Sequence, residues 1–320
     1  MGAYVIRRLL WIPITLILVS IVVFLLNRWL PGNVIDQMVS SMSPASSTVK
    51  IDRHAIEVML GLDKPVYVQY FKWISNIVLH GDMGNSLRSN FNVSQEIFRR
   101  LPVTLELALL ALLVGGLISI PVGVYAAIRQ DTVQDYVFRS LAIILISVPS
   151  FWLGTMIMIY PSIWWHWSPS MEYITFLKDP IGNLSMFIIP AAILGTGLAG
   201  SSMRMTRAMM LEVLRQDYTR TAWAKGLAER VIVLRHALKN ALIPVITIVG
   251  VQLPVLIGGA VIIEQIFSLP GLGRLMLTAL QQRDYTVVQG INLMFSAIVI
   301  FVNLFVDLGY GWMDPRIQYQ

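Results

Sequence analysis

Six apolar runs, each long enough to cross a lipid bilayer, constrain the fold of this 320-residue chain. A transmembrane helix needs about 20 consecutive apolar residues, because the hydrocarbon core of a bilayer is about 30 Å thick. The runs cover residues 9–30, 101–128, 136–160, 184–203, 241–263 and 287–308. Charged residues make up only 13% of the chain, against roughly 25% in soluble domains, which disfavours a water-soluble globule. The sequence therefore predicts an all-α, polytopic membrane protein, with six transmembrane helices in one domain that comprises residues 1–320.

The first run and the prolines of the later runs refine this prediction. Residues 9–30 form a stretch that is longer than the roughly 7–15 residues of a signal-peptide core, so we expect an uncleaved span. Prolines are tolerated inside membrane helices because neighbouring helices and polar side chains satisfy the freed backbone groups. Those inside the runs are Pro121, Pro149, Pro190, Pro244 and Pro254. Several helices should therefore be kinked.

The distribution of lysine and arginine predicts the orientation of the spans. If the N-terminus is cytoplasmic, the inner segments (1–8, 129–139, 204–240 and 309–320) together hold 13 basic residues. The short outer loops, 161–184 and 264–285, hold 3. Because short cytoplasmic loops are enriched in basic residues, both termini should be cytoplasmic.

Several kinds of chemistry have no basis in this sequence. The chain has no cysteine, which excludes disulfides, thiolate metal sites and cysteine nucleophiles. It also has no phosphate-binding GxxxxGK[ST] loop and no HExxH pair. We therefore expect no catalytic residue, no metal site and no cofactor in the chain itself. The net charge of +6 fits contact with anionic membrane lipid and does not point to nucleic acid.

The long outer segment, residues 31–100, is too patterned to be a simple linker. Asp52 could cap a short helix that ends at Leu60, before Gly61. Apolar side chains then recur at helical spacing, which predicts a second, amphipathic helix. This stripe comprises Val66, Tyr70, Trp73, Ile74 and Ile77. It could form a docking surface for an extracellular partner or a cap over the outer ends of the chain's own helices.

The inner segment 204–240 combines basic charge with an apolar stripe. It holds eight basic and three acidic residues. At intervals of three or four residues it also carries Trp223, Leu227, Val231, Leu234, Leu238 and Leu242. Gly226 could mark a bend between two short helices. The stripe could lie against the lipid interface, pack on the chain's own helix ends, or insert into the groove of a cytoplasmic partner.

A few polar residues fall inside the apolar runs. Gln252 and Asn292 lie well inside theirs, so they could line a polar pathway or form hydrogen bonds between helices. Glu106 and Asp307 lie near the ends of their runs, where solvation at the membrane interface explains them.

Four stretches in order along the chain together resemble one family. In chain order they are residues 61–65 with 81–86 and 101–107, residues 218–227 with 235–244, residues 264–275 with 283–285, and residues 310–316. They resemble the membrane permease subunit of bacterial and archaeal ABC importers of the dipeptide and oligopeptide class. Within that class, the long segment after the first span resembles the first-permease type. The resemblance implies the type I importer permease fold and a place in the inner, cytoplasmic membrane.

The resemblance also implies roles for particular residues. The inner stretch resembles the EAA loop, which docks into the ATPase subunit, although Arg220 and Thr221 stand where glutamate and alanine are expected. The implied ATPase-coupling residues are Arg220, Thr221, Ala222, Trp223, Lys225, Gly226, Leu227 and Ala228. The implied outer turn or gate comprises Phe267, Pro270, Gly271 and Gly273.

The resemblance further implies partners. These are a second, homologous permease that forms a heterodimer with this chain, two cytoplasmic ATPase subunits that bind ATP and Mg²⁺, and an external substrate-binding protein. The segment 31–100 would contact that binding protein. Peptides are the default substrate, although members of this class also carry nickel chelates, glutathione, haem, oligosaccharides or antimicrobial peptides.

Two other functions fit the sequence less well. A secondary symporter would need an ionisable residue with a partner near the membrane midplane, or broken helices in inverted repeats. The apolar runs hold no deep carboxylate or histidine of that kind. A membrane scaffold would not need a proline-rich bundle with polar residues inside it. The importer permease is therefore the expected function.

Overall fold

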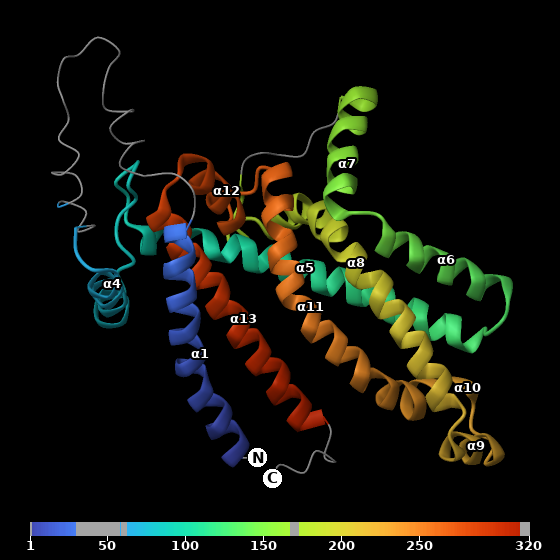
Figure 1. Cartoon of the computed structure of the whole chain (residues 1–320). Coiled ribbons are helices and arrows are strands. Elements are labelled where there is room, and N and C mark those ends of the chain that lie inside the picture. Colours follow the sequence, from blue (N-terminus) through green and yellow to red (C-terminus); the bar gives the residue numbers. More distant parts are fainter. Residues whose placement is uncertain (1, 30–57, 59–62, 167–172, 314–320) are drawn as a thin grey trace. The chain divides into compact units, whose positions relative to one another are not determined.

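The computed structural model describes residues 2–29, 58, 63–166 and 173–313 (Figure 1). Among these residues the regular secondary structure is helical, with turns and loops between the helices and an isolated antiparallel bridge between Asn85 and Asn92. The predicted all-α fold is therefore confirmed. The helix expected from Asp52 to Leu60 lies, apart from Val58, outside the described residues.

The described helices include most of the expected apolar runs. In chain order they are α1 (Gly2–Trp29), α4 (Val66–His80), α5 (Val93–Ile128), α6 (Val133–Ser147), α7 (Ser150–Trp165), α8 (Pro180–Leu214), α9 (Asp217–Ala224), α10 (Glu229–Val231), the π-helix η1 (Ile232–Ala237), α11 (Leu238–Ile266), α12 (Leu272–Gln282) and α13 (Tyr285–Met313). Five helical stretches of the described chain are long and apolar enough to cross a membrane. A sixth results if α6 and α7 together form one span.

The expected span over residues 136–160 is broken. It consists of the end of α6 and the start of α7, which meet at an angle of 90°. Proline disfavours the helical conformation of the residue before it. Val148, which precedes Pro149, accordingly has an extended backbone with φ −86° and ψ 120°. Pro149 thus coincides with a sharp break of 90°, where a kinked but continuous helix was expected.

The contacts of the chain divide it into two compact units. One comprises Met1–Ile6, Pro102–Arg274 and Phe301–Gln320, and the other comprises Arg7–Leu101 and Leu275–Ile300. Each unit is described separately below.

Helix α8 is the centre of the first unit. Its core cluster is shared with α5 and α11, and α7 packs against that cluster through Leu153 and Ile157. A Cβ atom added at Gly195 would lie 2.7 Å from the carbonyl oxygen of Ala111 on α5. Helices in membranes associate closely where small residues let their backbones approach. The small residues of α8 thus allow α5 to contact its backbone.

A buried ion pair joins the beginning of α6 to α8. Arg207 donates two hydrogen bonds to the carboxylate of Asp135, with N–O distances of 2.6 and 2.5 Å. The Asp135 side chain is fully buried, and that of Arg207 is 18% exposed. The backbone N–H of Asp131 donates a further bond to Asp135. This bidentate geometry fixes the N-terminal turn of α6 on the surface of α8.

Replacing Arg207 by methionine should destabilise the protein. The substitution leaves the Asp135 carboxylate buried without its counter-charge, which costs about 3–5 kcal/mol in comparable pairs. The double variant with Asp135→Leu should recover part of this loss, because no isolated charge then remains. Thermal unfolding of the purified chain in detergent measures both effects. Equal stability of the Arg207→Met variant and the wild type would contradict this account.

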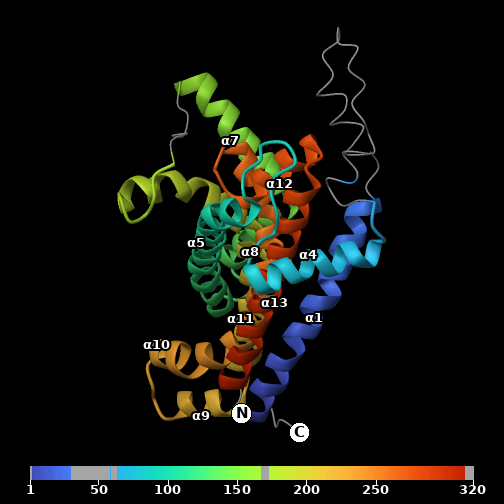
Figure 2. The same cartoon turned by 90° about the vertical axis from the view of Figure 1, so that its left-hand side faces the viewer.

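In the second unit, α4 packs against α1 (Figure 2). The hydroxyl groups of Ser20 on α1 and Tyr70 on α4 are 2.8 Å apart. The Phe24 ring lies 5.4 Å from that of Tyr70 and 5.8 Å from that of Trp73, centroid to centroid. The predicted amphipathic helix is thus confirmed, and two members of its stripe cover part of the chain itself. Tyr67, Phe71, Val78 and Leu79 of the same helix are exposed.

The loop between α4 and α5 is tied to the beginning of α13 within the same unit. The Ser86 hydroxyl donates a hydrogen bond of 2.6 Å to the carboxylate of Asp284, which is 2% exposed. Asp284 also accepts a bond from the backbone N–H of Val287. Ser94 accepts a bond from the N–H of Met83 and donates one to the carbonyl of Gly81. The loop therefore has a defined, hydrogen-bonded conformation.

Candidate functional site

The segment between α8 and α11 folds back on itself at Gly226. Helix α9 ends at Ala224, and Gly226 has a φ of +75°, a left-handed conformation that favours glycine. The backbone N–H groups of Gly226 and Leu227 donate to the carbonyls of Trp223 and Ala222, respectively. The bend predicted at Gly226 is therefore confirmed. We call residues 217–237 the junction segment.

The π-helix η1 explains how the junction segment enters α11. Val233, Ala237 and Ala241 are all buried in one cluster with Val124 and Met210. These three residues are spaced four positions apart. That spacing is slightly more than one turn of an α-helix, which has 3.6 residues, and slightly less than one turn of the wider π-helix, so the two helix types shift the side chains in opposite directions around the axis. Because residues 232–237 are π-helical and the following residues are α-helical, these side chains stay on one face. The change of helix type keeps the segment packed against α5 and α8.

The predicted apolar stripe is divided between a buried and an exposed part. Its first four members are partly exposed: Trp223 at 47%, Leu227 at 38%, Val231 at 39% and Leu234 at 50%. Leu238 instead packs against the buried cluster of the first unit. Packing on the chain's own helix ends therefore accounts for only part of the surface of these four side chains. We call these four side chains the exposed apolar face of the junction segment.

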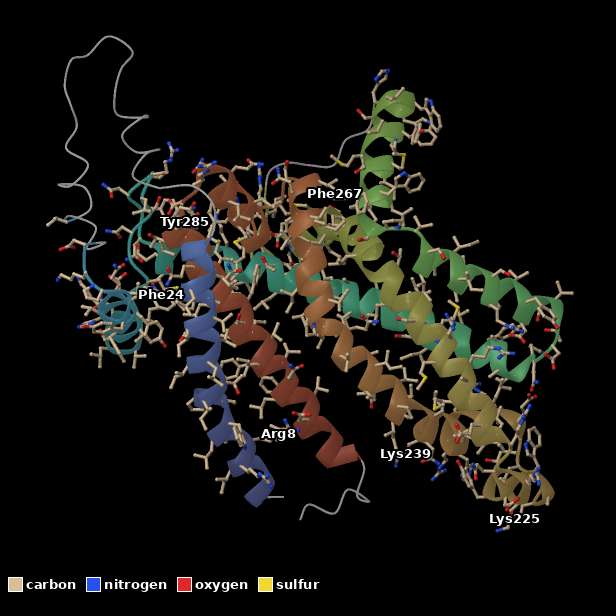
Figure 3. All side chains as sticks on the ribbon, in the orientation of Figure 1. Arg8, Phe24, Lys225, Lys239, Phe267 and Tyr285 are labelled. Carbon is tan, nitrogen blue, oxygen red and sulfur yellow. The ribbon has the colours of Figure 1, made fainter. Side chains whose placement is uncertain are left out.

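The base of α9 is anchored, whereas its charged side chains extend outward. Thr219 is fully buried and its hydroxyl donates to the carbonyl of Val213, the penultimate residue of α8. Ala222 is 7% exposed. Arg220 lies 3.6 Å from the carboxylate of Asp217, but both side chains are mostly exposed, so this ion pair is weak. Figure 3 shows Lys225 at the far tip of the segment.

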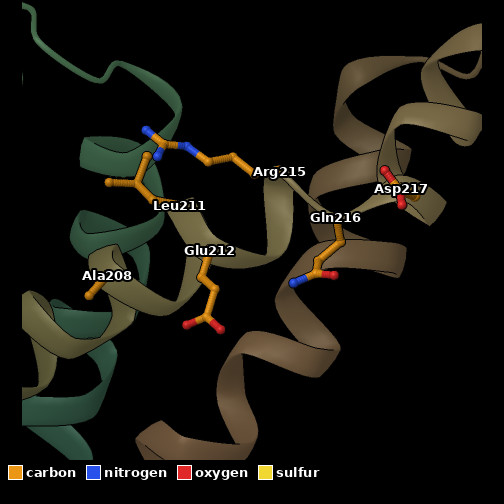
Figure 4. A pocket seen from close by; sticks show the side chains of 6 residues that line it. All are labelled: Ala208, Leu211, Glu212, Arg215, Gln216 and Asp217. Atoms are coloured by element: carbon orange, nitrogen blue, oxygen red, sulfur yellow. The ribbon is translucent and has the colours of Figure 1, made fainter.

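Two depressions flank the junction segment. One, with a volume of about 510 Å³, is lined by Ala208, Leu211, Glu212, Arg215, Gln216 and Asp217. Figure 4 shows the side chains of Glu212 and Gln216 pointing into the same space. The other has a volume of about 240 Å³ and includes Trp223 and Val233 in its wall. The surface around the exposed apolar face is therefore uneven and partly polar.

The other end of α11 carries a buried carboxylate, Glu264. Its side chain is 0% exposed. One oxygen accepts a bond of 2.6 Å from the hydroxyl of Thr104 on α5, and the other accepts a bond of 3.0 Å from the N–H of Arg274. The Thr104 hydroxyl in turn accepts a bond of 2.8 Å from the N–H of Leu272, at the beginning of α12. We call residues 264–274 the Glu264 turn.

The glycines predicted to form a tight turn are those that approach this carboxylate. A Cβ atom at Gly271 would lie 2.2 Å from the carboxylate carbon of Glu264. At Gly273 it would lie 2.3 Å from the Cα atom of Val261. Phe267 is buried in the core of the first unit, and Pro270 is half-buried. The turn is compact because two of its residues lack a side chain.

The two candidate pathway residues are each half-buried. Gln252 lies on α11 in the first unit. Asn292 lies on α13 in the second unit, where its carbonyl accepts a bond from the hydroxyl of Ser296. Glu106 on α5 is also half-buried and interacts with the side chain of Asn183 on α8.

Sequence reasoning missed two buried polar groups. It assigned no role to Glu264, although a carboxylate directly after the apolar run 241–263 was a visible signal. It likewise missed Asp135, which follows the helix cap Thr132. Their partners, Thr104 and Arg207, lie 160 and 72 positions away, so no local pattern could connect them.

Replacing Gly271 by alanine should disrupt the Glu264 turn. The new methyl group would overlap the buried carboxylate, and comparable overpacking costs about 1–3 kcal/mol. Gly258→Ala on α11 is the matched control, since a Cβ atom there meets no atom within 4 Å. Thermal unfolding in detergent should show a lower Tm for Gly271→Ala only. If both variants had the wild-type Tm, the close contact at Gly271 would not hold.

Comparison with family models covers nearly the whole chain. The model described as "Binding-protein-dependent transport system inner membrane component" matches residues 119–319. The model described as "Binding-prot-dependent transport system membrane comp, N-term" matches residues 1–108. Together they include the junction segment, the Glu264 turn and the N-terminal helices.

Curated relatives match over their full length. A Brucella abortus protein, named as a peptide transport system permease protein, is 42% identical and covers 100% of both chains. The dipeptide transport system permease protein DppB of Escherichia coli is 38% identical, with 99% of each chain covered. The oligopeptide transport system permease protein AppB of Bacillus subtilis is 40% identical, with 100% of each covered.

A solved structure shares the fold at low sequence identity. It is a crystal structure of an amino acid ABC transporter with histidines, which the chain matches with a TM-score of 0.51. The match covers 68% of this chain and 94% of the other, at 13% identity. At that identity the likeness concerns the fold alone.

Proposed function

The chain belongs to the family of inner membrane components of binding-protein-dependent transport systems, and on this basis we propose that it forms half of a peptide import pathway. It is a multi-pass permease of the inner membrane. Dipeptides or oligopeptides are the proposed substrates, because the relatives from E. coli and B. subtilis carry those names. The chain itself would hydrolyse no ATP. Two cytoplasmic ATPase subunits would bind ATP and Mg²⁺, and a second, homologous permease would complete the pathway.

The exposed apolar face of the junction segment is the observation that carries this proposal. Trp223 and Leu227 are large apolar side chains exposed on a segment whose base is buried. Tryptophan is enriched among the residues that contribute most to binding energy at interfaces, and apolar side chains on a helical segment can fill a hydrophobic groove of a partner. The occupant would be a groove of an ATPase subunit. Arg220 and Lys225 would orient the segment on that surface. Thr221 and Ala222 would contribute from α9, and Gly226 and Ala228 from the turn that follows it.

Topology follows from this assignment. If the junction segment meets cytoplasmic ATPases, both termini are cytoplasmic, in agreement with the basic residues of the inner loops. The turn formed by Phe267, Pro270, Gly271 and Gly273 then lies on the outer side, where it would act as a gate. The segment 31–100 would contact the external binding protein that delivers the peptide.

Transport would then be a coupled conformational equilibrium. ATP binding closes the ATPase pair, the docked junction segment moves with it, and the permease changes from an inward-open to an outward-open state. The binding protein releases its peptide into the cavity, and hydrolysis restores the inward-open state. Gln252 and Asn292 are the side chains that we propose for contact with peptide amides, since an amide group can both donate and accept hydrogen bonds.

Reconstitution tests the function. The four-subunit complex in proteoliposomes, supplied with its binding protein, should accumulate a radiolabelled dipeptide only when ATP is present on the ATPase side. Uptake driven by an ion gradient without ATP would instead support a symporter. Absence of uptake for di- and oligopeptides, with ATPase activity intact, would overturn the proposed substrate class.

The variant Leu227→Asp should weaken binding of the ATPase subunits. A carboxylate in an apolar groove should remove the contribution of an anchor residue, about 2 kcal/mol or more, which is roughly thirtyfold in affinity. The control is Leu177→Asp, the same substitution at a leucine that is 96% exposed ahead of α8. Co-purification and ATPase titration in detergent measure the affinity. Wild-type affinity in Leu227→Asp would refute the docking role.

A further inference from the structure

Helix α11 joins the junction segment to the Glu264 turn. It continues directly from η1 at Leu238 and ends at Ile266. At 1.5 Å per residue, its 29 residues extend over about 43 Å. Figure 3 shows Lys239 near one end of this helix and Phe267 at the other. A displacement of the junction segment can therefore reach the turn through a single helix.

Two buried side chains connect the end of this helix to its neighbours. Glu264 belongs to α11, and it accepts hydrogen bonds from Thr104 of α5 and from the backbone of Arg274 in α12. The hydroxyl of Thr104 also accepts the bond from Leu272. One carboxylate and one hydroxyl thus join residues of three helices, all of which lie in the first unit.

The surroundings of this network resist sliding of the turn along α11. Thr104, Glu264 and Leu272 are each 0% exposed, so water does not compete for their hydrogen bonds. Breaking one of these bonds would leave a buried donor or acceptor without a partner, which is unfavourable. The absence of space for a Cβ atom at Gly271 adds a steric limit. The turn and the end of α11 should accordingly move as one body.

We propose that Thr104 and Glu264 are positioning residues. They make residues 267–273 of the Glu264 turn move together with α11 during the transport cycle. The inference rests on the proposed function, because it concerns how ATPase movement reaches the opposite side of the permease. Neither residue touches the ATPase or needs to touch the peptide. Their loss should separate ATP hydrolysis from uptake and leave ATPase binding intact.

Substitutions of Thr104 separate the hydroxyl from the shape of the side chain. Valine keeps the branched shape but removes the hydroxyl, whereas serine keeps the hydroxyl. In the reconstituted complex with its binding protein, Thr104→Val should hydrolyse ATP within about twofold of the wild-type rate. Its uptake of dipeptide per ATP should fall about tenfold, as expected when a buried hydrogen bond is lost and its partner is left unsatisfied. Thr104→Ser should keep the wild-type ratio.

A second variant tests the same hydrogen bonds from the other side, in case Thr104→Val does not fold. Glu264→Gln replaces one carboxylate oxygen by an amide nitrogen, so it retains the shape but cannot accept both bonds. It should also lower uptake per ATP. The control is Gln265→Ala, which changes the adjacent, exposed residue and should keep the wild-type ratio.

Uptake is expressed per ATP hydrolysed and per assembled complex, so a change in coupling can be distinguished from a loss of ATPase activity or of assembly. A wild-type ratio in both Thr104→Val and Glu264→Gln would overturn the proposal. Failure of both variants to assemble would also overturn it, since their role would then be in folding. If the wild-type complex itself showed no ATP-driven uptake, the proposed function would fail, independently of these variants.

Discussion

The need to satisfy every backbone hydrogen bond without water governs this structure. In the hydrocarbon region an unpaired N–H or C=O group is costly, so irregular backbone is confined to places that protein encloses. The Glu264 turn meets this requirement with side chains. The carboxylate of Glu264 and the hydroxyl of Thr104 accept bonds from two N–H groups of the first turn of α12. A turn that ends one long helix and begins another is thereby stabilised inside the first unit.

Helix α8 forms a well-packed support for the junction segment. Its small residues let α5 approach its backbone, and its Arg207 holds the beginning of α6 through a buried ion pair. Thr219 then fixes α9 to the end of α8. The exposed apolar face of the junction segment is therefore presented by a well-packed support. A rigid support allows a partner to move the helices behind the segment as well as the segment itself.

Much of the fold and some of the site could be predicted from local patterns. The apolar runs predicted the long helices, because the thickness of a bilayer and the rise of a helix together set their length. The spacing of Tyr70 and Trp73 predicted α4, and Gly226 predicted a bend. The break at Val148 was only partly anticipated. A proline within an apolar run is compatible with a mild kink as well as with a 90° turn, and packing selects between them.

The sequence by itself determined that this chain is a helical membrane protein, where its apolar segments lie, and which family its motifs indicate. These properties depend on residue types and on spacings of a few positions, and both can be read directly from a contiguous stretch of sequence. Only the tertiary structure decided which polar residues are structural. Thr104 meets Glu264, and Asp135 meets Arg207, because α5, α6, α8 and α11 pack together. The partial burial of Leu238 and the greater exposure of Leu234 also depend on that packing, since both positions carry leucine on the same stripe.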